Sequence, residues 1–248
     1  MNWHMSLRAT VAIAAIVGLA TASAACGSSD SDEHSVRVMA AASLVDVMKP
    51  MTQAYGDEHG GAEVQVDAAA SSALVQRLES GAKADVLITA DTTTMDKAVA
   101  AGVAKDPVII ATNKLVIVVP AGNPSNVTGL EYFTAAGHRT VICASEVPCG
   151  RAAETAISAI NGTPQPISRA VDVRAALGAV TSGEADAALV YATDATSAGD
   201  KVETIEIPNA PVVEYPAAAL TDNGKDFVNL LSSDKGKQIL TDAGFGAP

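Results

Sequence analysis

From Val36 onward, strand-like and helix-like segments alternate along the chain, and this alternation restricts the possible folds more than any other feature of the sequence. Short runs rich in Val, Ile and Ala are followed by longer stretches in which apolar residues recur every three or four positions. Strands separated by helices build a largely parallel sheet, because each helix returns the chain to the edge where the next strand begins. The sequence therefore predicts an α/β fold.

The boundaries of the expected elements follow from these periods and from the residues that interrupt them. Strands are expected at Val36–Ala40, Val64–Val66, Asp85–Thr89, Lys114–Pro120, Val141–Cys143, Ala187–Tyr191 and Val212–Pro216. Helices are expected at Leu44–Tyr55, after Ser72 up to a stop at Gly81, and at Thr93–Ala101, Arg151–Ile160, Val173–Thr181, Lys225–Leu231 and Lys235–Asp242. Pro50 should kink the first helix or shorten its regular part.

The N-terminal segment has the composition of an export signal. Met1–Arg8 carries one basic residue, Ala9–Ala20 is almost wholly apolar, and Thr21–Cys26 is a region of small residues suited to cleavage. The apolar run is too short to span a bilayer comfortably. Residues 1–25 are therefore predicted to be a signal peptide, and the mature chain is predicted to be exported.

Cys26 is the expected site of lipidation. Ser23-Ala24-Ala25-Cys26 resembles a bacterial lipobox, although a lipobox usually carries Leu where this chain has Ser23. Residues 26–35 are then the lipidated Cys and a flexible linker, which anchor the protein to the outer face of the cytoplasmic membrane. The alternative is an ordinary secretory cleavage next to Cys26, without a lipid.

The mature chain is long enough for two lobes. About 220 residues follow the signal, enough for two units that each have a core. Lys114–Pro120 should carry the chain into the second lobe, and Val212–Pro216 should return it. We expect lobe 1 to comprise residues 36–109 and 217–248, and lobe 2 residues 110–216.

The chain is acidic, with 16 Lys and Arg against 28 Asp and Glu and a formal net charge of −12. This balance argues against a nucleic-acid partner, since such proteins use basic surfaces to neutralise phosphates. It also means that the long-range field repels anions. An anionic ligand would have to be held by local dipoles at short range.

Three transitions from strand to helix consist of small residues, namely Ala40–Leu44, Ala69–Ala73 and Val147–Gly150. Each places backbone N–H groups without partners at the start of a helix, where anions bind favourably. Two of them add Ser hydroxyls, and none contains Lys or Arg. The pattern predicts a small oxyanion held by neutral donors. The alternative is that these Ser residues are simply helix caps.

Other functional classes lack their residue patterns. His4, His34, His59 and His138 do not have the spacing of metal ligands, so we expect no metal site. The sequence contains neither a G-x-S-x-G elbow nor a phosphate-binding loop, and we expect no catalytic residues and no cofactor. A binder of amino acids would need an Arg for the carboxylate, and Arg174 is the candidate near a motif. These patterns favour a binding protein over an enzyme.

The order and spacing of six runs resemble the molybdate-binding proteins of bacterial ABC importers, and the resemblance covers nearly all of Val36 to Phe245. The runs are Ala40–Leu44, Ala70–Leu74, Gly81–Val86, Val147–Gly150, Asp172–Leu177 and Leu189–Ala195. The resemblance implies a type II periplasmic-binding-protein fold, with two α/β lobes and a ligand cleft between them. It also implies a monomer that captures molybdate or tungstate and delivers it to the permease subunits of an ABC importer.

The resemblance also implies which residues bind the ligand. They are Ser43, Ser71, Cys149, Val173 and Tyr191, with Ser72 as the alternative to Ser71. The two Ser residues and the Tyr match hydroxyl donors of the family, and Val173 matches a backbone N–H donor. Cys149 stands where the family usually has an Ala whose backbone N–H binds the ligand.

The ligand's chemistry agrees with this donor set. Molybdate carries no proton at neutral pH, so its site should offer donors, whereas a site for protonated phosphate benefits from a carboxylate acceptor. Asp172 is the nearby carboxylate, and we expect it to cap its own helix. The alternative function is a binding protein for another small anion, such as sulfate, phosphate or an amino acid, in the same fold.

Cys143 and Cys149 form an even pair once Cys26 is assigned to the lipid. In an oxidising compartment such a pair is a candidate disulfide. The alternative is two buried thiols.

Overall fold

The structure of the protein is a computed structural model that describes residues 35–248. The predicted signal peptide and Cys26 lie outside the described residues. The strands are β1 (Val36–Ala41), β2 (Val64–Ala69), β3 (Val86–Ile88), β4 (Val108–Pro120), β5 (Thr140–Cys143), β6 (Ser168–Ala170), β7 (Ala187–Tyr191), β8 (Val202–Glu206) and β9 (Val212–Ala219). The helices are α1 (Val45–Glu58), α2 (Ser71–Glu79), α3 (Thr92–Ala100), α4 (Pro148–Ala159), α5 (Val173–Thr181), α6 (Ala192–Ala198), α7 (Lys225–Ser232) and α8 (Asp234–Asp242). A short 3-10 turn, η1 (Ala42–Leu44), precedes α1.

The strands form two sheet regions with the same internal order, which confirms the expected two-lobe α/β fold. In the first region the order is β2-β1-β3-β9-β4, and in the second it is β6-β5-β7-β4-β8. In both, three parallel strands are followed by two strands that run antiparallel to their neighbours. β1, β2 and β3 of lobe 1 therefore correspond to β5, β6 and β7 of lobe 2.

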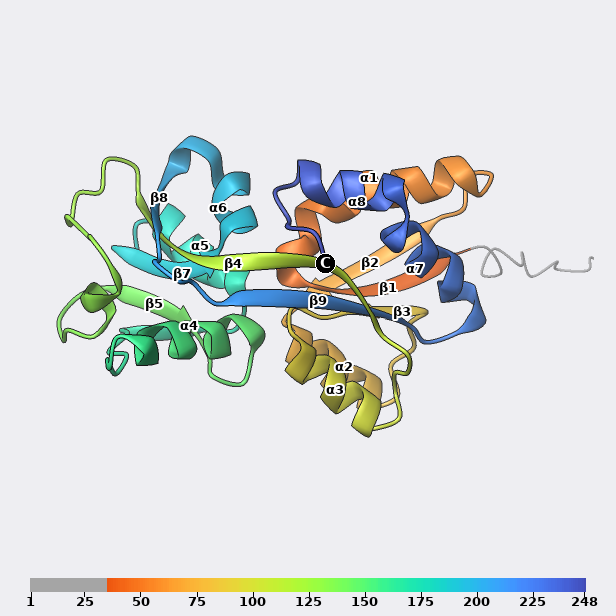
Figure 1. Cartoon of the computed structure of the whole chain (residues 1–248), viewed down its shortest axis with the longest axis horizontal. Coiled ribbons are helices and arrows are strands. Elements are labelled where there is room, and N and C mark those ends of the chain that lie inside the picture. The colour runs from red at the N-terminus through yellow and green to blue at the C-terminus, as the bar shows by residue number, and fades with distance from the viewer. Residues whose placement is uncertain (1–34) are drawn as a thin grey trace, which may run out of the picture. The chain divides into compact units, whose positions relative to one another are not determined.

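Strand β4 runs through both sheet regions, and the segment that leads into β9 returns the chain to the first (Figure 1). β4 pairs with β9 as far as Lys114 and with β7 from Leu115 onward. The sheets therefore change between Lys114 and Leu115 and again just before Val212. The lobe boundaries expected from the sequence, at residues 109/110 and 216/217, stay predictions.

Helices cover both faces of each sheet region (Figure 1). In lobe 1, α2 and α3 pack together on one face over a separate cluster that includes Leu74, Leu87 and Met95. α1, α7 and α8 cover the other face, and their core continues into lobe 2. In the described part of the chain no helix is long and apolar enough to cross a bilayer.

Three elements were not predicted. β6 has three residues, β8 is a largely exposed strand, and α6 begins directly at the end of β7 without a loop. None of them has the length or the clear apolar period by which an element is predicted from sequence. Pro50 lies inside α1, which runs without interruption from Val45 to Glu58, so the predicted shortening is wrong.

Gly150 in α4 sits against the loop that follows β5. A Cβ atom placed there would lie 1.8 Å from the carbonyl oxygen of Ala144. No side chain can occupy that space without movement of the helix start. The close packing therefore fixes where the first turn of α4 lies.

Gly150→Ala should lower the free energy of unfolding by roughly 1 to 3 kcal/mol or more, because the added methyl group forces α4 away from Ala144. Gly178 in α5 is the matched control, since a Cβ atom there would contact nothing within 4 Å. Gly178→Ala should stabilise by about 0.4 to 1 kcal/mol through helix propensity and chain entropy. Denaturant unfolding measures both changes, and equal effects would contradict the packing argument.

Candidate functional site

A small cavity of about 20 Å³ lies between the lobes, and all five predicted ligand-binding residues line it. From lobe 1 it is lined by Ala41, Ala42, Ser43, Ala70, Ser71 and Ala90, and from lobe 2 by Val147, Pro148, Cys149, Asp172, Val173 and Tyr191. A volume of this size admits the centre of one small ion or water. Ser72 instead lines a wider neighbouring hollow. The geometry thus favours Ser71 over Ser72 as a cavity residue.

Four helix starts meet at this cavity. Ser71 and Val173 are the first residues of α2 and α5, Cys149 is the second residue of α4, and Ser43 lies in the turn before α1. Backbone N–H groups in a first helical turn have no acceptor within the helix. The cavity therefore faces several free donors and the positive ends of helix dipoles, which together favour an anion.

The strand order explains why these starts converge. Ser43 and Cys149 follow the corresponding strands β1 and β5, and Ser71 and Val173 follow β2 and β6. Parallel strands end at the same edge of a sheet, and ligands of α/β folds bind outside that edge. Each lobe therefore presents an equivalent pair of helix starts to the cavity.

Ser71 is almost fully buried, and its hydroxyl oxygen accepts a hydrogen bond from the backbone N–H of Ala90 at 3.0 Å. This contact occupies an acceptor position of the hydroxyl and leaves its hydrogen available. The side chain can therefore donate into the cavity.

Ser43 is oriented by a chain of polar contacts from the strands that connect the lobes. The side-chain oxygen of Asn113 accepts from the N–H of Lys114 at 2.9 Å, which turns its amide nitrogen toward the hydroxyls of Thr193, at 2.8 Å, and Tyr215, at 3.5 Å. Tyr215 and Ser43 hydroxyls are 2.8 Å apart. Of these two neighbours of the Tyr215 hydroxyl, the amide nitrogen of Asn113 can only donate, so Ser43 is the one that can accept the hydrogen of Tyr215. With that direction, the hydrogen of Ser43 is left for the cavity.

The hydroxyl of Tyr191 is buried and has no hydrogen-bond partner among residues 35–248. Burial raises the pKa of Tyr191 well above its ordinary value, and nearby Tyr215 and acidic groups add to this effect. Burial also raises the pKa of Tyr215. Both phenols therefore stay protonated. A buried polar group without a partner is costly, so the hydroxyl of Tyr191 is expected to donate to a ligand in the cavity.

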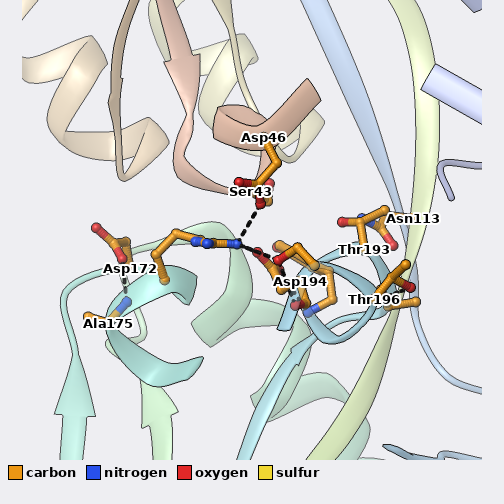
Figure 2. Close-up of polar contacts among 12 residues, drawn as sticks. Ser43, Asp46, Asn113, Asp172, Ala175, Thr193, Asp194 and Thr196 are labelled. Atoms are coloured by element: carbon orange, nitrogen blue, oxygen red, sulfur yellow. Dashed lines mark hydrogen bonds and ion pairs between the residues drawn. The ribbon is translucent and has the colours of Figure 1, made fainter. Parts of the chain in front are cut away.

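The carboxylate near the cavity is already engaged. Asp172 caps α5, and its oxygen accepts from the N–H of Ala175 at 2.8 Å (Figure 2). Within the described chain, no Lys or Arg side chain lines the cavity. In residues 35–248 there is likewise no group of three or more His, Cys, Asp and Glu that could hold a metal ion. The cavity offers neutral donors.

A disulfide joins Cys143 and Cys149. It connects the end of β5 to the start of α4, next to the cavity. Cys149 therefore cannot act as a free thiol in this state, and its backbone N–H is the group that it can offer to a ligand.

Two residues that organise the site, Tyr215 and Asn113, act through Ser43. The one local signal is a polar Asn within the largely apolar strand β4, and Tyr215 has none. Arg174, considered above as a ligand for a carboxylate, instead contacts Asp46, Asp194 and Ser197.

Asp194 is a buried carboxylate in the first turn of α6, three residues after Tyr191. One of its oxygens accepts from the N–H of Tyr191 at 3.3 Å, and the other lies 3.5 Å from the guanidinium group of Arg174 (Figure 2). Burial raises the pKa of Asp194 to about 7, and the positive charge of Arg174 opposes this rise. Folding therefore favours the protonated acid.

Asp194 should make the protein less stable as the pH rises from about 4 to about 7, because the folded state holds a proton that the unfolded state has already lost. Asp194→Asn removes this titration and keeps an acceptor for the N–H of Tyr191. The difference in the free energy of unfolding, variant minus wild type, should become more positive by on the order of 4 kcal/mol between pH 4 and pH 8. Urea unfolding across that range measures the difference, and parallel curves would show that Asp194 ionises normally.

Comparisons with solved structures agree with the two-lobe fold. The periplasmic molybdate-binding protein of Azotobacter vinelandii superimposes with a TM-score of 0.72 at 19% identity, covering 86% of this chain and 99% of the other. The sulfate-binding protein SubI of Mycobacterium tuberculosis gives a TM-score of 0.74 at 18% identity, covering 85% and 86%. At these identities the likeness concerns the fold alone.

Comparisons of sequence reach further. The molybdate-binding protein ModA of Mycobacterium tuberculosis is 35% identical over 223 residues, which cover 87% of this chain and 85% of the relative. ModA of Escherichia coli is 32% identical over 246 residues, covering 92% and 95%. The model of the bacterial extracellular solute-binding protein family matches residues 36–246. The chain therefore belongs to the bacterial extracellular solute-binding proteins.

Proposed function

We propose that this protein captures molybdate or tungstate in the cavity between its lobes and delivers it to the permease of an ABC importer. It acts as a monomer, anchored by a lipid on Cys26, and catalyses no reaction. The ligand is bound through Ser43, Ser71, Tyr191 and the backbone N–H groups of Cys149 and Val173. The relatives named for molybdate binding support the choice of ligand.

The observation that carries the proposal is the donor set of the cavity. Ser43, Ser71 and Tyr191 each present a hydroxyl hydrogen, and the helix starts add backbone N–H groups. The carboxylate of Asp172 is occupied by its own helix. Such a site suits a fully deprotonated dianion, because its hydroxyl and backbone groups are donors and one oxygen of its carboxylate is already engaged.

Sulfate is the second candidate, because it is also a dianion that accepts hydrogen bonds. The fold likeness to a sulfate-binding protein agrees with this alternative. The two anions differ in size, so the dimensions of the closed cavity decide between them.

Calorimetric titration of the purified protein with molybdate, tungstate, sulfate and phosphate tests the proposal. We expect tight binding of molybdate and tungstate and weak binding of the other two, with a matching rise in melting temperature because the ligand binds the folded state. Tighter binding of sulfate than of molybdate would assign the protein to sulfate.

Tyr191→Phe should weaken molybdate binding by about 1.5 to 3 kcal/mol, the range for hydrogen bonds to a charged partner. Tyr215→Phe should weaken it less, because it removes the orientation of Ser43 and not a direct donor. Val173→Ala is the control, since it retains the backbone N–H. A larger loss for the control than for Tyr191→Phe in the same titration would show that side-chain packing dominates the site.

A further inference from the structure

Two arginines of lobe 2 reach across to lobe 1 from positions beside the ligand-binding helix starts. Arg151 lies in the first turn of α4, two residues after Cys149, and Arg174 directly follows Val173 at the start of α5. Neither lines the cavity. Each contacts an Asp of lobe 1.

Arg151 makes the more extensive contact. Its Nε lies 2.8 Å and its Nη2 2.6 Å from the carboxylate of Asp91, and its Nη2 also donates to the hydroxyl of Thr94 at 2.7 Å. The pair is largely buried, with side-chain exposures of 25% for Arg151 and 15% for Asp91. Such an arrangement retains more of its Coulomb energy than an exposed pair.

Asp91 is also held in place by a contact within its own lobe. Its other oxygen accepts from the N–H of Thr94 at 2.9 Å and caps α3. It also directly follows Ala90, which lines the cavity and donates to Ser71. Because the acceptor is already ordered, less side-chain entropy is lost when Arg151 binds it.

Arg174 makes a weaker connection between the lobes. Its Nη1 donates to Asp46 in α1 at 2.9 Å (Figure 2). The side chain of Asp46 is more than half exposed. The same nitrogen contacts Ser197 and Asp194 of its own lobe. If the lobes separate, Arg174 keeps these two partners, so it loses little.

We infer that Arg151 and Arg174 are positioning residues that favour the closed arrangement of the lobes, through ion pairs with Asp91 and Asp46, and that they are not countercharges for the anion. This inference rests on the proposed function, since closure serves to complete the donor set. Affinity is reduced by the fraction of molecules that are not closed, so pairs that favour closure raise it without touching the ligand. The contact of Arg151 should matter more than that of Arg174.

Asp91→Asn separates this role from a simple electrostatic one. Asn preserves the cap of α3. If Arg151 served as a countercharge, removing the negative charge of Asp91 would strengthen the binding of a dianion. If the pair favours closure, the same change weakens binding and speeds dissociation. The sign of the effect decides.

We expect Asp91→Asn to weaken molybdate binding about tenfold, mainly through faster dissociation, and Asp46→Asn to weaken it about two- to threefold. Adding Asp91→Asn to Arg151→Met should cost nothing further, because the pair is already broken. Asp67→Asn is the matched control, since Asp67 pairs with Arg77 within lobe 1. Calorimetry and stopped-flow measure these values. Unchanged or tighter binding by Asp91→Asn would overturn the inference.

A second measurement does not require the proposed ligand. Spin labels on Ala100→Cys and Ser158→Cys, in a Cys26→Ser background, report the distance between α3 and α4. Without ligand, Asp91→Asn should shift the distribution toward longer distances, and Asp67→Asn should not. If the wild type binds none of the four oxyanions, the proposed function fails. In that case the spin-label distances alone test the role in closure. An unchanged distance distribution in Asp91→Asn would overturn that role.

Discussion

The free N–H groups at four helix starts are the constraint on which the rest of this structure depends. The residues that carry them line one small cavity from both lobes, and a helix start without a partner for its donors is stable only where water or an anion can reach it. Bulky side chains would block this approach, which explains why the described part of lobe 1 lines the cavity with Ala and Ser alone. The contact of Gly150 with Ala144 is one result of that close packing.

The arginine side chains near the cavity form ion pairs between the lobes and do not line the cavity as cations. Within residues 35–248 no Lys or Arg lines the cavity, and Arg151 and Arg174 are paired with aspartates of the other lobe. The cavity therefore offers dipoles and hydroxyls, while ion pairs connect the lobes. Neutral donors of fixed geometry distinguish anions by size and protonation better than a flexible cation can.

The sequence predicts local features of this protein well and long-range ones poorly. Ala187–Tyr191 and Val173–Thr181 have the bounds predicted from their periodicity and from the cap at Asp172. The five proposed ligand residues were found because each lies in a short run that resembles a known family. The partners Tyr215 of Ser43 and Asp91 of Arg151 are 172 and 60 residues away. Such contacts depend on how the lobes meet, and no local pattern encodes them.

The repeated strand order has a consequence for how the two lobes share the donors of the cavity. Equivalent strands of the two lobes end at equivalent helix starts, so the cavity has a pair of such starts on each side. Tyr191, at the end of β7, has no counterpart with a hydroxyl among the described lobe 1 residues that line the cavity. The two sides of the cavity are therefore alike in backbone and different in side chain, and the lobes differ in which donors they lose when one side chain is changed.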